Sequence, residues 1–289
     1  MKLIQSRDNP FFKELVKLGG SARQRSKSNQ TLLDGTHLLA AYLDSGNQPR
    51  HILLNAAALH DDEIVGLLER ISERLLMEPL AIRLGEQTTL AKSLVMAGHP
   101  KDVPVTQLDD KLFAELSDLK TPTGILTLIE IPQPAEPVAA AGFALLLEDI
   151  QDPGNLGSML RSAAAAGCDA VILSQDCADA WSPKVLRAAM GGHFVLRIYE
   201  QQDLPGVARA FSGTLLATSP QATCSLYDCD LRGNVAFLIG NEGAGLSADL
   251  LNLATQKITI PMHGQVESLN AAAATAICLF EAVRQRHLK

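Results

Sequence analysis

The sequence has few aromatic residues and no long apolar run. Aromatic side chains make up 4% of its 289 residues, and tryptophan occurs once. Because hydrophobic residues still make up 47%, we expect a folded chain with a core of aliphatic side chains and alanine, and wholesale disorder is excluded. No apolar stretch reaches the ~18 residues of a membrane-spanning helix, and the first residues lack the apolar centre of a signal peptide. We therefore expect a soluble, cytoplasmic protein.

The five cysteines are odd in number and scattered, and no CxxC pair occurs. Cys224 and Cys229 have no second pair at zinc-finger spacing. Reduced thiols that act as small hydrophobic side chains fit this pattern better than a disulfide framework does. We expect no metal site.

Positive charge is scarce overall, but it is concentrated at one end of the chain. The net charge of −7 by itself argues against a nucleic-acid partner. Residues 1–31, however, hold seven basic and two acidic residues, a net of +5, so the other 258 residues carry −12. An acidic body with a basic N-terminal arm is typical of a protein that contacts phosphate with one local surface. A solvated helix face is an equally good interpretation of this segment alone.

A chain of this length suggests two domains, at roughly 150 residues each. Three prolines within 132–137, followed by small residues, can continue neither a helix nor a strand. We place a linker over 132–142, between a first domain over 1–131 and a second over 143–289. The first domain is predicted to be a small α/β sandwich, with helices at 36–45, 62–75 and 86–95 and strands at 51–54, 80–82 and 125–129.

The second domain shows a stronger alternation of strands and helices. Apolar strands separated by helices indicate a parallel sheet that is covered on both faces. The last helix has one apolar stripe, which usually faces a core and would also suit a dimer interface. The expected strands are 143–147, 170–173, 195–198, 214–217, 235–239 and 257–260, and the expected helices are 155–166, 183–190, 204–211, 247–254 and 268–287. The stripe consists of Leu269, Ala273, Ala276, Phe280 and Val283.

Three polar segments follow buried strands of the second domain, where open α/β sheets place ligand sites. In the first, over 148–163, Asn155 is a good N-cap, and Arg161 lies beside the apolar stripe of the next helix, within reach of a cleft. An isolated helical arginine is more often simply solvated. In the third, over 258–272, Ser268 is a natural N-cap and Asn270 projects from the first turn.

The second segment, over 237–247, is rich in glycine. Its glycines follow the order GxxGxG, which is the reverse of the dinucleotide fingerprint, and no GxxxxGK[ST] loop occurs. A nicotinamide dehydrogenase and a nucleotide hydrolase are therefore disfavoured. A glycine-rich turn without a ligand remains possible for this segment alone.

In this order and spacing, the three segments resemble the motifs of SpoU/TrmH-type RNA ribose 2′-O-methyltransferases of the SPOUT superfamily. The first domain more weakly resembles the ribosomal-protein-L30-like substrate-binding domain of that family, through residues 6–10, 33–39 and 121–126. The matching motif residues are Asp152-Pro153-Gly154-Asn155-Leu156-Gly157 with Arg161, Gly240-Asn241-Glu242-Gly243-Ala244-Gly245-Leu246-Ser247, and Ile260-Pro261-Met262 with Ser268-Leu269-Asn270.

This resemblance implies a parallel sheet whose C-terminal part forms a deep trefoil knot, one of the rare exceptions to unknotted topology. The knot of that family binds S-adenosylmethionine largely through backbone groups, and the family forms homodimers through helices that include the last one. Carried over by position, the cofactor-binding residues are Thr218, Leu238, Gly240, Ile260, Met262 and Leu269.

The resemblance also implies roles in methyl transfer to structured RNA, either rRNA or tRNA. Arg161 would position the ribose hydroxyl and stabilise its developing charge, rather than act as a base. Asn155 and Glu242 would orient Arg161 or the ribose, and Ser268 and Asn270 would shape the target pocket. Asn241 departs from the residues common in the family, with no expected effect on activity. The expected RNA contacts are Arg23, Arg25, Lys27, Lys184 and Arg187.

Two alternatives remain open. One is a non-catalytic RNA-binding or ribosome-assembly protein on the same fold, which would not need intact polar motif positions. The other is a SPOUT enzyme that methylates a base nitrogen. The pair Asn155 and Arg161, followed by Ser268-Leu269-Asn270, favours ribose over base.

Overall fold

The structure is a computed structural model that describes residues 1–76, 103–266 and 268–287, and its chain forms two compact units. Unit 1 comprises Met1–Ile131 with Trp181–Arg187, and unit 2 comprises Pro132–Ala180 with Ala188–Lys289. The sequence places residues 181–187 in the second domain, whereas in the structure they group with unit 1. The strand predicted at 80–82 and the helix predicted at 86–95 lie outside the described residues.

The described residues of unit 1 form a five-stranded mixed sheet in the order β1-β4-β3-β5-β2. Strand β5 runs antiparallel to both of its neighbours, and the other pairs are parallel. The predicted strands at 51–54 and 125–129 are confirmed as β3 and β5. The strands are β1 (Lys2–Ile4), β2 (Gln30–Asp34), β3 (His51–Leu54), β4 (Val105–Leu108) and β5 (Ile125–Glu130).

Helices cover both faces of this sheet. Successive residues of a strand point to opposite faces, so a single strand can contribute apolar side chains to both helical layers. Leu53 of β3 packs with α1 and α6 on one face, while Ile52 and Leu54 pack with α3 and α4 on the other. Unit 1 therefore has an α/β arrangement, with helices on both faces of its sheet. The helices are α1 (Pro10–Gly20), α2 (Ala22–Ser28), α3 (Thr36–Asp44), α4 (Asp62–Leu76) and α6 (Asp110–Leu116), with a short 3₁₀ turn at Ala58–His60. Helix α8 (Pro183–Ala189) begins in the stretch 181–187.

The basic N-terminal segment is not an extended arm, because it folds into β1, α1 and α2. Arg25 of α2 is only 5% exposed. Its guanidinium donates hydrogen bonds to the carbonyl oxygens of Leu18 and Gly19, the latter at 3.0 Å, near the end of α1. The expectation that Arg25 faces RNA is therefore wrong, since this side chain ties α2 to the carbonyl end of α1.

Unit 2 contains a seven-stranded sheet in the order β10-β12-β9-β11-β6-β7-β8, in which every pair is parallel. The predicted parallel sheet is confirmed, with β10 as an additional short edge strand. The strands are β6 (Phe143–Leu147), β7 (Ala170–Leu173), β8 (Arg197–Tyr199), β9 (Thr214–Thr218), β10 (Cys224–Ser225), β11 (Val235–Ile239) and β12 (Gln256–Thr259).

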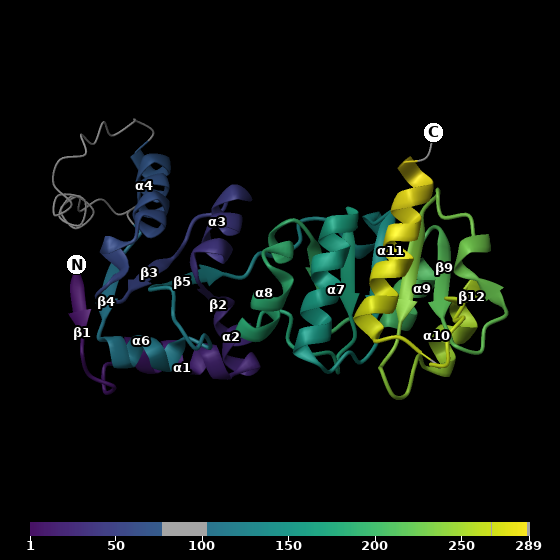
Figure 1. Ribbon diagram of the computed structural model, residues 1–289, viewed down its shortest axis with the longest axis horizontal. Helices are drawn as coiled ribbons and strands as arrows, with labels where there is room; N and C mark the ends of the chain where they lie inside the picture. Colours follow the sequence, from purple (N-terminus) through teal and green to yellow (C-terminus); the bar gives the residue numbers. More distant parts are fainter. Residues whose placement is uncertain (77–102, 267, 288–289) are drawn as a thin grey trace. The chain divides into compact units, whose positions relative to one another are not determined.

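Helices α9 and α10 pack through Leu204, Ala208 and Leu250 on one face of this sheet. Helices α7 and α11 lie side by side (Figure 1). The helices are α7 (Pro153–Ala166), α9 (Leu204–Ala210), α10 (Ala248–Leu253) and α11 (Ala271–His287), with 3₁₀ turns at Val138–Ala140, Gly192–Phe194 (η3) and Leu226–Asp228. Among the described residues, no helix combines the length and apolarity needed to cross a bilayer.

The apolar stripe predicted for the last helix is not its core face. Phe280 is 47% exposed and Ala273 is also exposed, whereas Cys278 and Leu279 are fully buried. Helix α11 instead buries a neighbouring face that includes Thr275, Cys278, Leu279 and Ala282, and it packs against α7. Apolar residues occur on both faces, so periodicity could not identify the one that packs inward.

Candidate active site

The three polar segments meet at the carboxyl edge of the parallel sheet in unit 2. Strands β12, β9, β11 and β6 are neighbours in that order and run in the same direction. The loops after β6, β11 and β12 therefore leave the sheet from the same edge. This is the edge at which open α/β sheets bind ligands.

The first loop leads directly into helix α7. The N-cap of this helix is Asp152, whose carboxylate accepts a hydrogen bond from the backbone N–H of Asn155 at 2.7 Å. Pro153 occupies the first helical position, where it loses no hydrogen bond. The expectation that Asn155 caps the helix is therefore wrong. Asn155 lies in the first turn, and its side chain makes other contacts.

The Asn155 side chain joins all three motifs. Its Nδ2 donates to Oε1 of Glu242 at 2.7 Å, and its Oδ1 accepts from Nδ2 of Asn270 at 3.0 Å. Glu242 follows β11, and Asn270 precedes α11. The side-chain amide of Asn155 therefore links three segments that are distant in the sequence. The two bonds also fix the orientation of that amide, with its nitrogen toward the carboxylate. Three of the five residues expected to act in methyl transfer thus form one hydrogen-bonded cluster.

Asn270 also caps helix α11. Its Oδ1 accepts hydrogen bonds from the backbone N–H groups of Ala272 and Ala273, at 2.9 and 3.3 Å. The helix begins at Ala271, three residues later than the sequence predicts. Asn270, not Ser268, is therefore the N-cap, and Ser268 is exposed in the preceding loop.

Arg161 is exposed on α7, and in the described part of the chain its guanidinium makes no hydrogen bond or ion pair. Its backbone is firmly placed, because Gly192 of η3 packs against the helix at this point. A Cβ on Gly192 would lie 3.2 Å from the carbonyl oxygen of Leu160 and 3.5 Å from Cα of Arg161. A fixed backbone with a solvated guanidinium suits a cation that meets an anionic ligand from outside.

The residues proposed for the cofactor lie at the ends of the adjacent strands β9 and β11 and in the loop that follows β12. Thr218, at the end of β9, donates its hydroxyl to the carbonyl oxygen of Leu238 in β11 at 3.1 Å. Ile260 and Met262, after β12, are partly buried, and Leu269 is 38% exposed. Partly exposed apolar side chains beside backbone polar groups fit the adenosyl part of S-adenosylmethionine.

Gly240 has a stronger reason to be glycine than ligand access. A Cβ at this position would lie less than 3.0 Å from backbone atoms of Gly245 and Leu246. The loop after β11 folds back on itself here, with an isolated bridge between Asn241 and Gly245. Glycine is therefore required by the closure of the loop itself, whereas the sequence pattern suggests only close approach of a ligand.

Other residues of these loops make hydrogen bonds that the sequence does not predict. Asn241 Nδ2 donates to the carbonyl oxygen of Asp149 at 2.9 Å, and its Oδ1 accepts from the N–H groups of Gly243 and Ala244. Glu148 accepts from the N–H of Ser247 at 2.6 Å. The only sequence signal for these bonds is the preference of Asn and Asp for turns, which does not reveal a partner many residues away.

The candidate RNA contacts all lie in unit 1. Arg23 and Lys27 are exposed on α2, and Lys184 is exposed on α8. Arg187 lies 3.9 Å from a carboxylate oxygen of Asp118, which partly neutralises it. In the parts of the chain that the structure describes, no group of three or more His, Cys, Asp or Glu side chains could hold a metal ion.

Comparisons with known proteins agree with this geometry. Residues 142–280 match the SpoU rRNA Methylase family. An uncharacterized tRNA/rRNA methyltransferase of Synechocystis is 34% identical over 98% of this chain and 94% of its own length. The 23S rRNA (guanosine(2553)-2′-O)-methyltransferase RlmP of Bacillus subtilis is 30% identical over 97% of this chain and 98% of its own.

Solved structures resemble the whole chain. An AdoMet-bound rRNA methyltransferase from Sinorhizobium meliloti aligns with a TM-score of 0.76 and 25% identity, over 100% of this chain and 99% of that one. An RNA 2′-O ribose methyltransferase aligns with a TM-score of 0.73 and 28% identity, over 99% and 100%. This protein belongs to the SpoU rRNA methylase family.

Proposed function

We infer that this protein is an RNA ribose 2′-O-methyltransferase that uses S-adenosylmethionine. The observation that carries this conclusion is the hydrogen-bonded cluster of Asn155, Glu242 and Asn270, one residue from each motif. Family membership and the AdoMet-bound structural neighbour support the choice of cofactor. The intact polar cluster also disfavours a purely RNA-binding protein, which would have no use for it.

The chemistry requires alignment more than activation. When bound, S-adenosylmethionine supplies a methyl group on a positively charged sulfur, which is already a strong electrophile. The residues of this chain must hold the 2′-hydroxyl in line with that methyl group and help its proton to leave. Arginine carries a permanent positive charge in proteins, so the role of Arg161 is to position the hydroxyl and its neighbouring phosphate and to stabilise negative charge as it develops. Asn155 and Glu242 orient the ribose beside it.

We also propose the deep trefoil knot of this family for unit 2. Two features of the connectivity support it. Strand β12 pairs with β9 near one end of the sheet, and the chain then passes to α11, which packs against α7, the helix after β6. Asn270 meets Asn155 on the way. Such a path would form the bent cofactor pocket from Leu238, Gly240, Ile260, Met262 and Leu269, with Thr218 beside it.

For the substrate we propose structured RNA, with rRNA favoured over tRNA because RlmP of Bacillus subtilis acts on 23S rRNA. Unit 1, as an L30-like domain, would select the RNA through exposed cations such as Arg23, Lys27 and Lys184. An rRNA substrate would place the protein where ribosomes assemble, which in a bacterium is the cytoplasm.

We further propose a homodimer through α11. The exposed face of this helix supports it, since Phe280 is 47% exposed. Large exposed apolar side chains on a helix next to a site are typical of an interface. Replacing Phe280 with Glu should shift the sedimentation coefficient from dimer to monomer, while Tyr227→Glu, at another exposed aromatic residue, should not.

The experiment that tests the function is transfer of labelled methyl groups to RNA from cells that lack this protein. Nuclease digestion and mass spectrometry should locate the label on a ribose 2′-oxygen, as a linkage resistant to alkali. Label on a base nitrogen would establish the alternative SPOUT base methyltransferase. Tight RNA binding without any transfer would establish the non-catalytic alternative.

A further inference from the structure

The loop that precedes helix α7 contains a residue in an unfavourable backbone conformation. Asp149, two residues after the end of β6, has a φ of +55°. Side chains with a Cβ rarely adopt this left-handed region, although Asp and Asn tolerate it better than most. Such a conformation persists only where the surroundings enforce it, and it is common at functional sites.

The hydroxyl of Ser174 is one of the groups that enforce this conformation. Ser174 follows β7, the neighbour of β6. Its Oγ accepts a hydrogen bond from the backbone N–H of Asp149 at 2.9 Å and donates one to Oδ1 of Asp149 at 2.6 Å. The next residue, Ile150, is fully buried, and its N–H lies 3.4 Å from Sγ of Cys177. The segment after β7 therefore holds this loop through its contacts with Asp149 and Ile150.

Asn241, in the loop after β11, also bonds to Asp149. Its Nδ2 donates to the carbonyl oxygen of Asp149 at 2.9 Å. The adjacent residue, Glu242, accepts from Asn155 in the first turn of α7. Two consecutive residues of the second motif thus bond to both ends of the segment 149–155. The position of the Glu242 carboxylate relative to α7 consequently depends on the backbone of Asp149.

We propose that Asp149 and Ser174 form a positioning pair for methyl transfer. The pair holds the left-handed turn that presents the Asp149 carbonyl to Asn241, and through Asn241 it sets the spacing between Glu242 and the start of α7. Neither residue of the pair contacts the reacting atoms. The inference rests on the proposed methyltransferase activity, and it adds two residues that the motifs do not include.

The test compares substitutions that distinguish the effect of the left-handed backbone conformation at Asp149 from the effect of its side-chain hydrogen bond to Ser174. Asp149→Ala should lower kcat at least about tenfold, because alanine disfavours the left-handed conformation and lacks the bond to Ser174. Asp149→Asn should keep kcat within about threefold, since asparagine tolerates this φ and its Oδ1 can accept from Ser174. Ser174→Ala should lower kcat by several-fold, and Ser174→Thr should restore it. The affinity for S-adenosylmethionine should change less than kcat does in Asp149→Ala and Ser174→Ala.

A matched control is Gln201→Ala, since Gln201 has a φ of +56° in unit 2, is exposed and lies outside these loops. It should leave kcat unchanged. Hydrogen–deuterium exchange of the protein without ligands gives an independent readout, in which Ser174→Ala should speed exchange over 148–155 and 240–247. If Ser174→Ala speeds exchange but even the wild type transfers no methyl group, the proposed function is refuted, and only the structural link between Asp149 and Ser174 stands. Wild-type kcat in Asp149→Ala, or equal losses in Asp149→Asn and Asp149→Ala, would overturn the pair.

Discussion

Arg161 presents a cation at the site without any partner that would neutralise it among the described residues. If it stabilises the developing alkoxide, its effect falls on the transition state, and the cofactor complex should be unaffected. Arg161→Ala should methylate RNA on the order of 10²–10³ times more slowly while binding S-adenosylmethionine normally. Lysine lacks the planar fork, so Arg161→Lys should recover little. Single-turnover methyl transfer measures the effect, and a near-normal rate in Arg161→Ala would remove this role.

Gly240 and Gly243 form a matched pair within one loop. A Cβ at Gly240 would lie less than 3.0 Å from backbone atoms, whereas the nearest atom to a Cβ at Gly243 is the Asn241 Oδ1 at 3.5 Å, an ordinary contact. We expect Gly240→Ala to displace the loop and weaken S-adenosylmethionine binding strongly in calorimetry. Gly243→Ala should bind nearly as the wild type does. Equal affinities in both variants would show that the closure of this loop does not shape the pocket.

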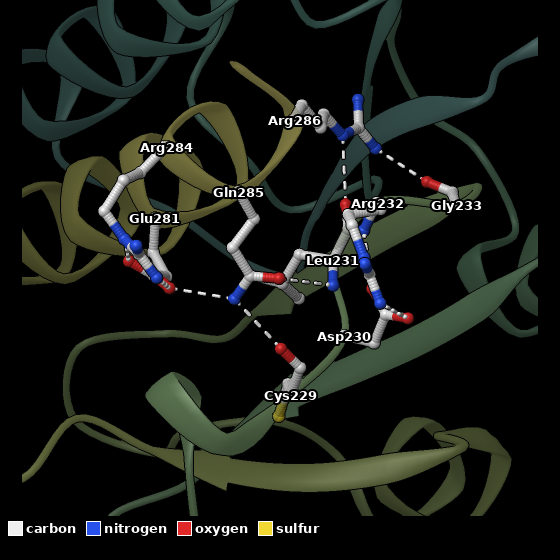
Figure 2. Close-up of polar contacts among 9 residues, drawn as sticks. All are labelled: Cys229, Asp230, Leu231, Arg232, Gly233, Glu281, Arg284, Gln285 and Arg286. Carbon is white, nitrogen blue, oxygen red and sulfur yellow. Dashed lines mark hydrogen bonds and ion pairs between the residues drawn. The ribbon is translucent and has the colours of Figure 1, made fainter. Parts of the chain in front are cut away.

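At the scale of elements, the C-terminal half of α11 is tied to the loop over residues 229–233 (Figure 2). Gln285 spans the loop: its Nε2 donates to the carbonyl oxygen of Cys229, and its Oε1 accepts from the N–H of Leu231, both at 3.0 Å. Arg286 donates to the carbonyl oxygens of Leu231 and Gly233, at 3.0 and 2.8 Å. These bonds fix the C-terminal end of the helix whose N-cap is Asn270.

Removing the Gln285 amide should therefore destabilise unit 2. In Gln285→Ala the N–H of the buried Leu231 loses its partner, which costs about 1–3 kcal/mol of the free energy of unfolding. Arg232→Ala is the control in the same loop, because its ion pair with Asp230 is exposed on both sides and should contribute little. Urea unfolding measures both variants. Equal stabilities would mean that water replaces the amide at no cost.

Glu281 makes the same helix sensitive to acid. Hydrogen bonds from the Arg284 guanidinium lower the pKa of this buried carboxylate below its ordinary 4.5. A pKa that is lower in the folded state stabilises the fold above pH 4.5, and that contribution is lost as the pH falls through the folded-state pKa. Between neutral pH and pH values below 4.5, the wild type should thus lose more stability than Glu281→Gln. Parallel pH profiles in urea unfolding would contradict this.

Most elements of unit 2 could be predicted because their signals are local. The apolar runs predict β11 at its observed bounds, 235–239, and β6 at 143–147. Local signals do not predict the role of a residue whose side chain bonds to a partner far away in the sequence. Asn155 and Ser268 are both good capping residues, yet Asp152 and Asn270 cap the helices, and the Asn155 side chain bonds across the motifs to Glu242 instead.

At the scale of the whole molecule, an acidic chain must confine its contacts with RNA to a small surface. The net charge is −7, but residues 1–31 carry +5. The structure reduces the number of available cations there, since Arg25 is buried and Arg7 and Lys13 pair with Glu115 and Asp8. A charge count from sequence includes such residues, because it cannot tell a cation that faces solvent from one that caps a helix.

Arg23, Lys27 and Arg25 should consequently respond differently to substitution, although all three lie in one short helix. If unit 1 binds RNA through α2, Arg23→Ala and Lys27→Ala should each weaken binding and reduce the dependence of log K on log salt by roughly 0.7–0.9. Neither should change the stability of the protein, because both side chains are exposed. Arg25→Ala should instead lower the free energy of unfolding by on the order of 1–3 kcal/mol, since the carbonyls of Leu18 and Gly19 lose their donor. Filter binding over a range of salt concentrations, together with urea unfolding, separates these effects. An unchanged salt dependence in Arg23→Ala and Lys27→Ala would show that this face of α2 is only solvated, and that RNA is bound elsewhere.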